Sequence, residues 1–153
     1  MADVLIRELR DGDCEYLAAN LRSADLDEVD ACGMDDPLAA LYFCAATSTQ
    51  TWVGVIDGRV ACIFGVGAIS ILGGIGSPWM LGTDDITRHP SAFIKHSLPY
   101  IRVMLAAYPR LENHVDARNT KAVRWLKRAG FTLGEPVPYG PKGMLFHPFE
   151  MRA

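Results

Sequence analysis

Residues 60–82 contain no charged side chain over 23 consecutive positions. An uncharged run of that length can cross a bilayer as one helix. Six glycines and Pro78 interrupt it, however, and charged residues follow at once. Because glycine and proline disfavour a continuous helix, the sequence favours two buried strands joined by a turn at 73–76, and we predict no membrane span.

A β-hairpin is predicted at the start of this stretch. Residues 52–56 and 60–64 flank Asp57-Gly58, a dipeptide that favours a two-residue hairpin turn. A third extended run, at 78–81, follows the glycine-rich turn. The centre of the chain is therefore expected to be a sheet.

Residues 4–9 predict an earlier strand, and helical segments follow it. Asp11 and Asp13 offer caps for a helix that extends to Leu21, and residues 25–31 predict a second helix. Residues 36–37, an aspartate followed by a proline, are typical of the start of a third.

A long helix is predicted from Pro90 to about Tyr108. Pro99 lies inside it and removes one backbone hydrogen bond, so a kink or a restart is expected there. Beyond this helix, the sequence predicts the segments 111–116 (strand), 119–129 (helix), 131–133 (strand) and 144–146 (strand). The order of elements predicts an α/β (α+β) fold in a single domain spanning 1–153.

Charge and cysteine content exclude several function classes. The net charge is -3, so the chain as a whole has no net electrostatic attraction to nucleic acid or to an anionic membrane surface. The four cysteines are far apart and the four histidines are scattered, so neither a metal site nor a disulfide framework is predicted. The N-terminus has charges every few residues and is not a signal or transit peptide, which predicts a cytoplasmic protein.

The segment 111–131 is the most specific part of the sequence. A strand runs into Asn-x-x-Ala at 119–122, and an amphipathic helix then ends in Lys-x-x-Gly-Phe at 127–131. This pattern resembles the fifth strand and fourth helix of the GNAT (N-acetyltransferase) superfamily. Asn119 caps the helix and leaves an amide facing the cleft, and Gly130 supplies the left-handed turn after it. The resemblance implies a mixed central sheet with helices on both faces.

A closer resemblance covers nearly the full length. Residues 21–33 and 78–83, together with 111–131, are similar to small GNAT-like proteins of tailed phages and prophages, which are named either as acyltransferases or as internal virion proteins. That resemblance implies either an acyl-CoA-dependent N-acyltransferase acting on a small or protein amine in the bacterial cytoplasm, or a non-catalytic protein of the virion, of phage assembly or of host interaction.

The GNAT resemblance also implies acetyl-CoA as cofactor and a set of residues that hold it. By position, the cofactor-binding candidates are Leu81, Thr83, Arg88, His89, Ser91, Ala92, Asn119 and Arg124. Helix N-termini and free backbone N–H groups bind phosphate well. Asp84 and Asp85 are the candidate catalytic base, although a loop or helix cap is the alternative for both.

The chain departs from the GNAT pattern at two places. GNAT enzymes carry paired glycines in the coenzyme loop, but residues 83–92 contain none, and Asp84 and Asp85 would repel phosphate if they pointed inward. The tyrosine that often protonates the leaving thiolate corresponds to Leu126. Tyr108 and Tyr139 are the alternative donors of that proton, although their spacing gives no support for either.

Two charged groups remain open to interpretation. Lys121, Arg124 and Arg128 share one face of the predicted helix. They could bind the phosphates of a nucleotide, or they could form an ordinary solvated helix face. The acidic run at 25–36 could attract a cationic amine or a basic partner, or form an ordinary solvated helix surface.

Overall fold

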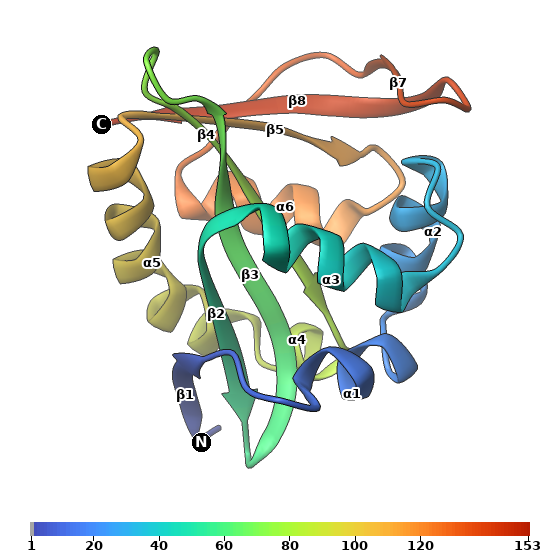
Figure 1. The fold of residues 1–153 in the computed structure, drawn as a ribbon, viewed down its shortest axis with the longest axis vertical. Coiled ribbons are helices and arrows are strands. Elements are labelled where there is room, and N and C mark those ends of the chain that lie inside the picture. The colour runs from blue at the N-terminus through green and yellow to red at the C-terminus, as the bar shows by residue number, and fades with distance from the viewer. Residues whose placement is uncertain (1) are drawn as a thin grey trace.

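The computed structural model describes residues 2–153 and is shown in Figure 1. Its strands are β1 (Val4–Glu8), β2 (Ser48–Ile56), β3 (Arg59–Ser70), β4 (Ile75–Gly82), β5 (Arg110–Asp116), β6 (Thr132–Leu133), β7 (Val137–Tyr139) and β8 (Met144–Arg152). Its helices are α1 (Asp13–Ala19), α2 (Ser23–Ala31), α3 (Pro37–Thr47), α4 (Asp85–Arg88), α5 (Pro90–Ala107) and α6 (Thr120–Ala129). One mixed sheet has the order β1-β2-β3-β4-β5-β8-β6, and β7 pairs with β8.

The uncharged stretch 60–82 forms most of the β3–β4 antiparallel hairpin, as its glycines predicted. The preceding turn is also confirmed: Asp57 and Gly58 both have positive φ, at 50° and 79°, which a two-residue turn of this kind requires. Within residues 2–153, no helix is both long enough and apolar enough to span a membrane.

The sheet opens between β4 and β5. These two strands are parallel, and in the described chain their pairing is confined to Ile75 with Arg110 and Gly76 with Leu111. At this closed end, the ring of Tyr108 packs so closely on Gly76 that an added Cβ would lie 2.6 Å from it. Figure 1 shows β5 and β8 crossing the top of the molecule at a steep angle to β2, β3 and β4. The two halves of the sheet therefore diverge from this point.

Helices cover both faces of the sheet, as the GNAT resemblance implied. On one face, α1, α2 and α3 bury residues such as Leu17 and Leu41 against Val53 and Ile63 of the sheet. On the other face, α5 and α6 bury residues such as Phe93 and Leu126. Because alternate residues of a strand point to opposite faces, a single strand contributes side chains to the hydrophobic cores on both faces of the sheet.

Several sequence-based boundaries are corrected. Helix α1 ends at Ala19 rather than Leu21, and its N-terminus has no side-chain cap. The Asp13 carboxylate instead accepts bonds from the Arg7 guanidinium at 2.8 and 3.0 Å. Helix α5 continues through Pro99 as one element, so no restart occurs. The proline is exposed, which keeps its ring out of the core.

The C-terminal strands also differ from the prediction. Strand β8 runs to Arg152 instead of ending at 146, because it pairs with β5 along seven register positions. Strand β7 lies between the two predicted strands 131–133 and 144–146, where no strand was predicted. The cap of α3 is confirmed, since the Asp36 carboxylate accepts the N–H of Leu38 at 3.1 Å.

Candidate functional site

Two cavities adjoin where β4 and β5 diverge. The larger, here called the central cavity, has a volume of about 240 Å³ and extends between α2, α3, α5 and the sheet. The smaller, here called the mouth pocket, has a volume of about 160 Å³ and lies between α5 and α6. Five residues line both of them: Arg22, Met80, Phe93, Ala122 and Trp125. The pair of cavities therefore connects the two faces of the sheet.

The mouth pocket is basic. Lys121, Arg124 and Arg128 line it from α6, and they recur on one face because residues three and four apart on a helix are neighbours. None of the three forms an ion pair with another residue in 2–153. Arg128 donates to the Ser91 hydroxyl at 3.4 Å. The pocket thus presents three cations that are not neutralised by neighbouring carboxylates.

The N-terminus of α5 opens onto the same pocket. Pro90 is its first residue and lines the pocket without filling it, and no side chain caps the helix. The N–H of Phe93 bonds to the carbonyl of His89 at 3.0 Å. The N–H groups of Ser91 and Ala92 precede the first full helical turn and have no carbonyl acceptor within the helix. A helix end of this kind, beside three cations, fits a diphosphate.

Asp84 and Asp85, which would repel a phosphate if they pointed into the mouth pocket, do not line it. Asp84 is exposed, and Asp85 is buried in ion pairs with Arg59 at 3.2 Å and with Arg88 at 2.6 Å. The hydrogen bond from Arg59 holds the pKa of Asp85 below its ordinary value despite its burial, and Arg88 adds to the effect. Neither carboxylate lines the mouth pocket or the central cavity.

The remaining sequence-based candidates fall into three groups. Leu81 and Asn119 line the central cavity, and Arg124 lines the mouth pocket. Thr83 is buried at the other edge of β4, where its hydroxyl accepts the N–H of Asp85 at 3.2 Å. Arg88 is bound to Asp85, and His89 joins α4 to α5. Ser91 and Ala92, at the start of α5, do not line the mouth pocket themselves, although the Ser91 hydroxyl accepts a hydrogen bond from Arg128, which does.

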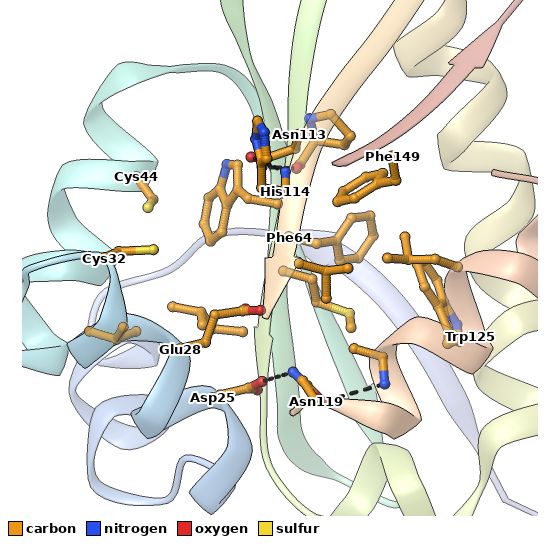
Figure 2. A pocket seen from close by; sticks show the side chains of 18 of the residues that line it. Asp25, Glu28, Cys32, Cys44, Phe64, Asn113, His114, Asn119, Trp125 and Phe149 are labelled. Atoms are coloured by element: carbon orange, nitrogen blue, oxygen red, sulfur yellow. Dashed lines mark hydrogen bonds between the residues drawn. The ribbon is translucent and has the colours of Figure 1, made fainter. Parts of the chain in front are cut away.

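A buried polar network crosses the open end of the sheet. The Arg22 guanidinium donates to Asp25 at 2.7 Å and to the side-chain oxygen of Asn119 at 3.4 Å. The Asn119 amide donates in turn to Asp25 at 3.3 Å (Figure 2). Asp25 also accepts the N–H of Gly82, the last residue of β4, at 2.8 Å. The network therefore ties the end of β4 to the start of α6.

One backbone donor on β4 faces the gap. The N–H of Thr83 bonds toward β3, to Ala61 at 2.8 Å, whereas the N–H of Gly82 points to the opposite edge, at Asp25. Because successive N–H groups of a strand alternate between its edges, the N–H of Met80 also points toward β5. Pro78 has no N–H, and its carbonyl accepts from Asn113 at 2.7 Å. Met80 can therefore donate a hydrogen bond into the cleft.

Glu28 is the ionisable group that stands out in the central cavity. It extends from α2 toward β5 (Figure 2). There its carboxylate accepts the N–H of Asp116 at 2.7 Å. Burial raises its pKa to about 7, and the carboxylates of Asp25 and Asp116 add to that rise, whereas the Asp116 N–H and Arg22 oppose it. A carboxyl group with this pKa can exchange a proton near neutral pH.

A stacked aromatic pair also lines the central cavity. His114 of β5 stacks on Tyr139 of β7, with ring centroids 4.0 Å apart, and both line the central cavity. Burial lowers the pKa of His114, so the ring is neutral at pH 7. Tyr108 lies at the closed end of the sheet instead, with its hydroxyl bonded to Thr49. Leu126 lines the central cavity, but its hydrocarbon side chain has no proton to donate.

Sequence reasoning missed Arg22 and Glu28 as individual site residues. Glu28 belongs to the acidic run at 25–36, which the sequence left open between a surface that attracts a cationic amine or a basic partner and an ordinary solvated helix surface. Two other acids of that run have structural partners: Asp36 caps α3, and Asp30 forms an ion pair with Lys142 at 2.9 Å. Glu28 differs from these neighbours in its contact with Asp116, which is 88 residues away. A contact over that separation cannot be predicted from a local sequence pattern.

Comparison with known proteins gives structural matches alone. No protein-family model matches the chain, and no curated protein sequence does. An acetyltransferase of the GNAT family from Streptococcus pneumoniae is 20% identical, with a TM-score of 0.66 over 98% of this chain and 99% of the other. A GNAT superfamily phosphinothricin acetyltransferase from Sinorhizobium meliloti, solved in complex with AcCoA, is 13% identical, with a TM-score of 0.74 over 97% and 88%.

A ribosomal-protein-alanine N-acetyltransferase from Brucella melitensis is similar as well. It is 14% identical, with a TM-score of 0.72 over 97% of this chain and 99% of the other. Likeness at this level of identity establishes the architecture and leaves the reaction open. The chain has the GNAT fold, a mixed α/β sheet with an opening between β4 and β5.

Proposed function

We propose that this protein is an acyl-CoA-dependent N-acyltransferase, with acetyl-CoA as donor and a primary amine as acceptor. The observation that carries the proposal is the pair of adjoining cavities through the open sheet. Unpaired cations and a helix N-terminus lie at one end, and a carboxyl group that titrates near pH 7 lies at the other. The GNAT fold and its AcCoA-binding neighbour agree with this assignment.

The chain's own groups would divide the work of binding. Lys121, Arg124 and Arg128 would hold the phosphates of the coenzyme, together with the free N–H groups at the start of α5. The N–H of Met80 would donate to an acyl carbonyl oxygen in the gap between β4 and β5. When bound, acetyl-CoA supplies a thioester acyl group and a thiol leaving group, whose pKa of roughly 8.5 lets it depart without a side-chain acid.

Glu28 would act as the general base. An amine arrives protonated at neutral pH and must lose a proton before its nitrogen can form a bond. Ionised Glu28 takes that proton, directly or through one water, and returns it to solvent. Asp84 and Asp85 remain sequence-based candidates, but Asp85 is held by two arginines and neither residue lines a cavity. We therefore assign the base to Glu28.

A second candidate is a protein that keeps the fold without the reaction, in a phage virion or in host interaction as the sequence resemblance suggests. Two observations favour it: residues 83–129 contain no glycine, and Leu126 replaces the tyrosine. A non-catalytic role does not explain the three unpaired cations around the mouth pocket.

A thiol-release assay tests the proposal. The purified protein is mixed with acetyl-CoA and a panel of primary amines at pH 8, and free CoA thiol is followed by its reaction with a chromogenic disulfide. We expect amine-dependent release that Glu28→Gln reduces and that Asp27→Asn, an exposed neighbour on α2, leaves intact. Saturable acetyl-CoA binding with no release from any amine would favour the non-catalytic candidate.

A further inference from the structure

The central cavity has a distinct region on the α2–α3 side of the sheet, here called the acceptor half. Its walls are formed by side chains from six places in the chain: Glu28, Met34, Cys44, Trp79, His114 and Tyr139. Figure 2 shows Cys44 and Glu28 on the α2–α3 side of β5, and Trp125 beyond the strand on the other side. An amine acceptor would enter from the α2–α3 side.

The charge of the acceptor half amounts to one carboxyl group. Asp25 also lines the central cavity, but it is buried and bound to Arg22, Asn119 and the N–H of Gly82. Glu28 pairs with a backbone N–H alone. The other acids of the 25–36 run do not line the cavity. A ligand with one positive charge can therefore be matched here, whereas additional positive charges would find no carboxylate.

The rest of the acceptor half is apolar and aromatic. Trp79 is fixed by a hydrogen bond from its indole N–H to Ser48 at 2.7 Å. Tyr139 lies between His114, 4.0 Å away in a stacked arrangement, and the edge of Phe146, at 5.2 Å. Met34 and Cys44 lie on the facing helical side. Aromatic walls held in place by such contacts favour a flat, apolar group over a polar chain.

Neutral His114 is consistent with a cationic ligand. Burial lowers the pKa of its ring, and the nearby Glu112 opposes that shift. At pH 7 and above the ring carries no charge that would repel an ammonium group. The unpaired positive charges, on Lys121, Arg124 and Arg128, lie across the sheet in the mouth pocket, and Arg22, which lines both cavities, is paired with Asp25.

From this arrangement we infer that the acceptor half binds a small primary amine with a single positive charge and an aromatic substituent, and that it discriminates against polyamines. The ammonium group lies at Glu28, and the ring lies among Trp79, His114 and Tyr139. This inference rests on the proposed function, because it names the acceptor of the same site. Unlike the proposed function, the amine preference can be tested without any acyl-CoA.

The test is a calorimetric titration of the protein alone with 2-phenylethylamine, with spermidine and with 2-phenylethanol. We expect 2-phenylethylamine to bind at least about tenfold more tightly than spermidine, a difference of about 1.4 kcal/mol. Glu28→Gln should weaken 2-phenylethylamine about tenfold and leave the uncharged 2-phenylethanol unchanged. Tyr139→Ala should weaken both aromatic ligands, and Asp27→Asn should change neither. Because Tyr139 is half-exposed on an edge strand, its removal should not prevent folding, which a melting curve checks.

Equal or tighter binding of spermidine would overturn the inference, as would loss of 2-phenylethanol binding in Glu28→Gln. The result also separates this inference from the proposed function. Binding of acetyl-CoA together with a preference for spermidine refutes the aromatic acceptor alone. Binding of 2-phenylethylamine by a protein that ignores acetyl-CoA refutes the transferase and keeps the amine site.

Discussion

Glu28 of α2 accepts the backbone N–H of Asp116, the last residue of β5, at 2.7 Å. The contact holds a carboxyl group at the open end of the sheet, close to the carboxylates of Asp25 and Asp116. Burial is the main reason that its pKa rises to about 7, and the two neighbouring carboxylates contribute. The contact with Asp116 thus fixes the position of the proposed base, whereas burial is the main cause of its raised pKa.

The first prediction concerns the pH dependence of turnover. If ionised Glu28 accepts the amine proton, kcat/KM rises with pH and levels off above a limb near pH 7. Glu28→Gln should lower kcat/KM by roughly 10²–10⁴ and abolish that limb. Steady-state rates from pH 5.5 to 9 measure both, with Asp27→Asn as control. A Glu28→Gln variant that keeps the rate and the limb would show that another group is the base.

The second prediction concerns stability. The folded protein holds the Glu28 proton more tightly than the unfolded chain, where the pKa is about 4.5. The contribution of this group to stability is therefore complete below pH about 4.5 and is lost as pH rises through about 7. Glu28→Gln, which carries no charge, should gain stability relative to wild type between pH 5 and 8, by roughly 2–3 kcal/mol. Urea unfolding of both proteins at each pH measures the difference, and a constant difference across this range would contradict the raised pKa.

The third prediction concerns the network that bridges β4 and α6. Arg22 and Asp25 are 5% and 2% exposed, so removing the guanidinium leaves an unpaired buried carboxylate. Arg22→Met should cost about 3–5 kcal/mol of unfolding free energy. The double variant Arg22→Met/Asp25→Asn should be less destabilised than the sum of the two single changes. Denaturant unfolding of the four proteins gives the coupling; strictly additive losses would mean that the pair does not act as a unit.

The fourth prediction separates Asp85 from catalysis. Its two partners are largely exposed, with side chains 56% and 64% accessible for Arg59 and Arg88, so solvent screens the pairs. Asp85→Asn should cost about 1 kcal/mol. Because the pKa of Asp85 is lowered in the folded state, that deficit should be complete above the ordinary aspartate value of 3.8 and be lost as pH falls through the lowered folded-state pKa. Turnover per folded molecule should stay within twofold. A large loss of turnover with unchanged melting would restore Asp85 as the base.

Much of this fold could be predicted from local sequence patterns. Asp57-Gly58 fixes a turn because two adjacent positive-φ residues are rarely tolerated elsewhere, and Asp36-Pro37 fixes a helix start through a cap and a preset φ. The segment 111–131 gave a strand, a capped helix and a left-handed Gly130, all of which the structure contains. These features are decided within a few residues, so the sequence displays them.

The site was less predictable because it is assembled from distant parts of the chain. Arg22 meets Asn119 across 97 residues, and Glu28 meets Asp116 across 88. The sequence placed Asp84 and Asp85 at the right loop but could not show that Arg59, 26 residues before Asp85, turns that carboxylate away from the cleft. It also could not show which member of the acidic run at 25–36 enters the cavity.

Binding of acetyl-CoA in the mouth pocket is tested by a calorimetric titration of the protein with acetyl-CoA. We expect saturable binding at one site, and binding at least about tenfold weaker after Arg124→Ala/Arg128→Ala, since each charged hydrogen bond contributes roughly 1.5–3 kcal/mol. Lys127→Ala, on the same helix but outside the mouth pocket, should bind like the wild type. Absence of heat and of any rise in melting temperature at millimolar acetyl-CoA, or binding that ignores the two arginines, would contradict it.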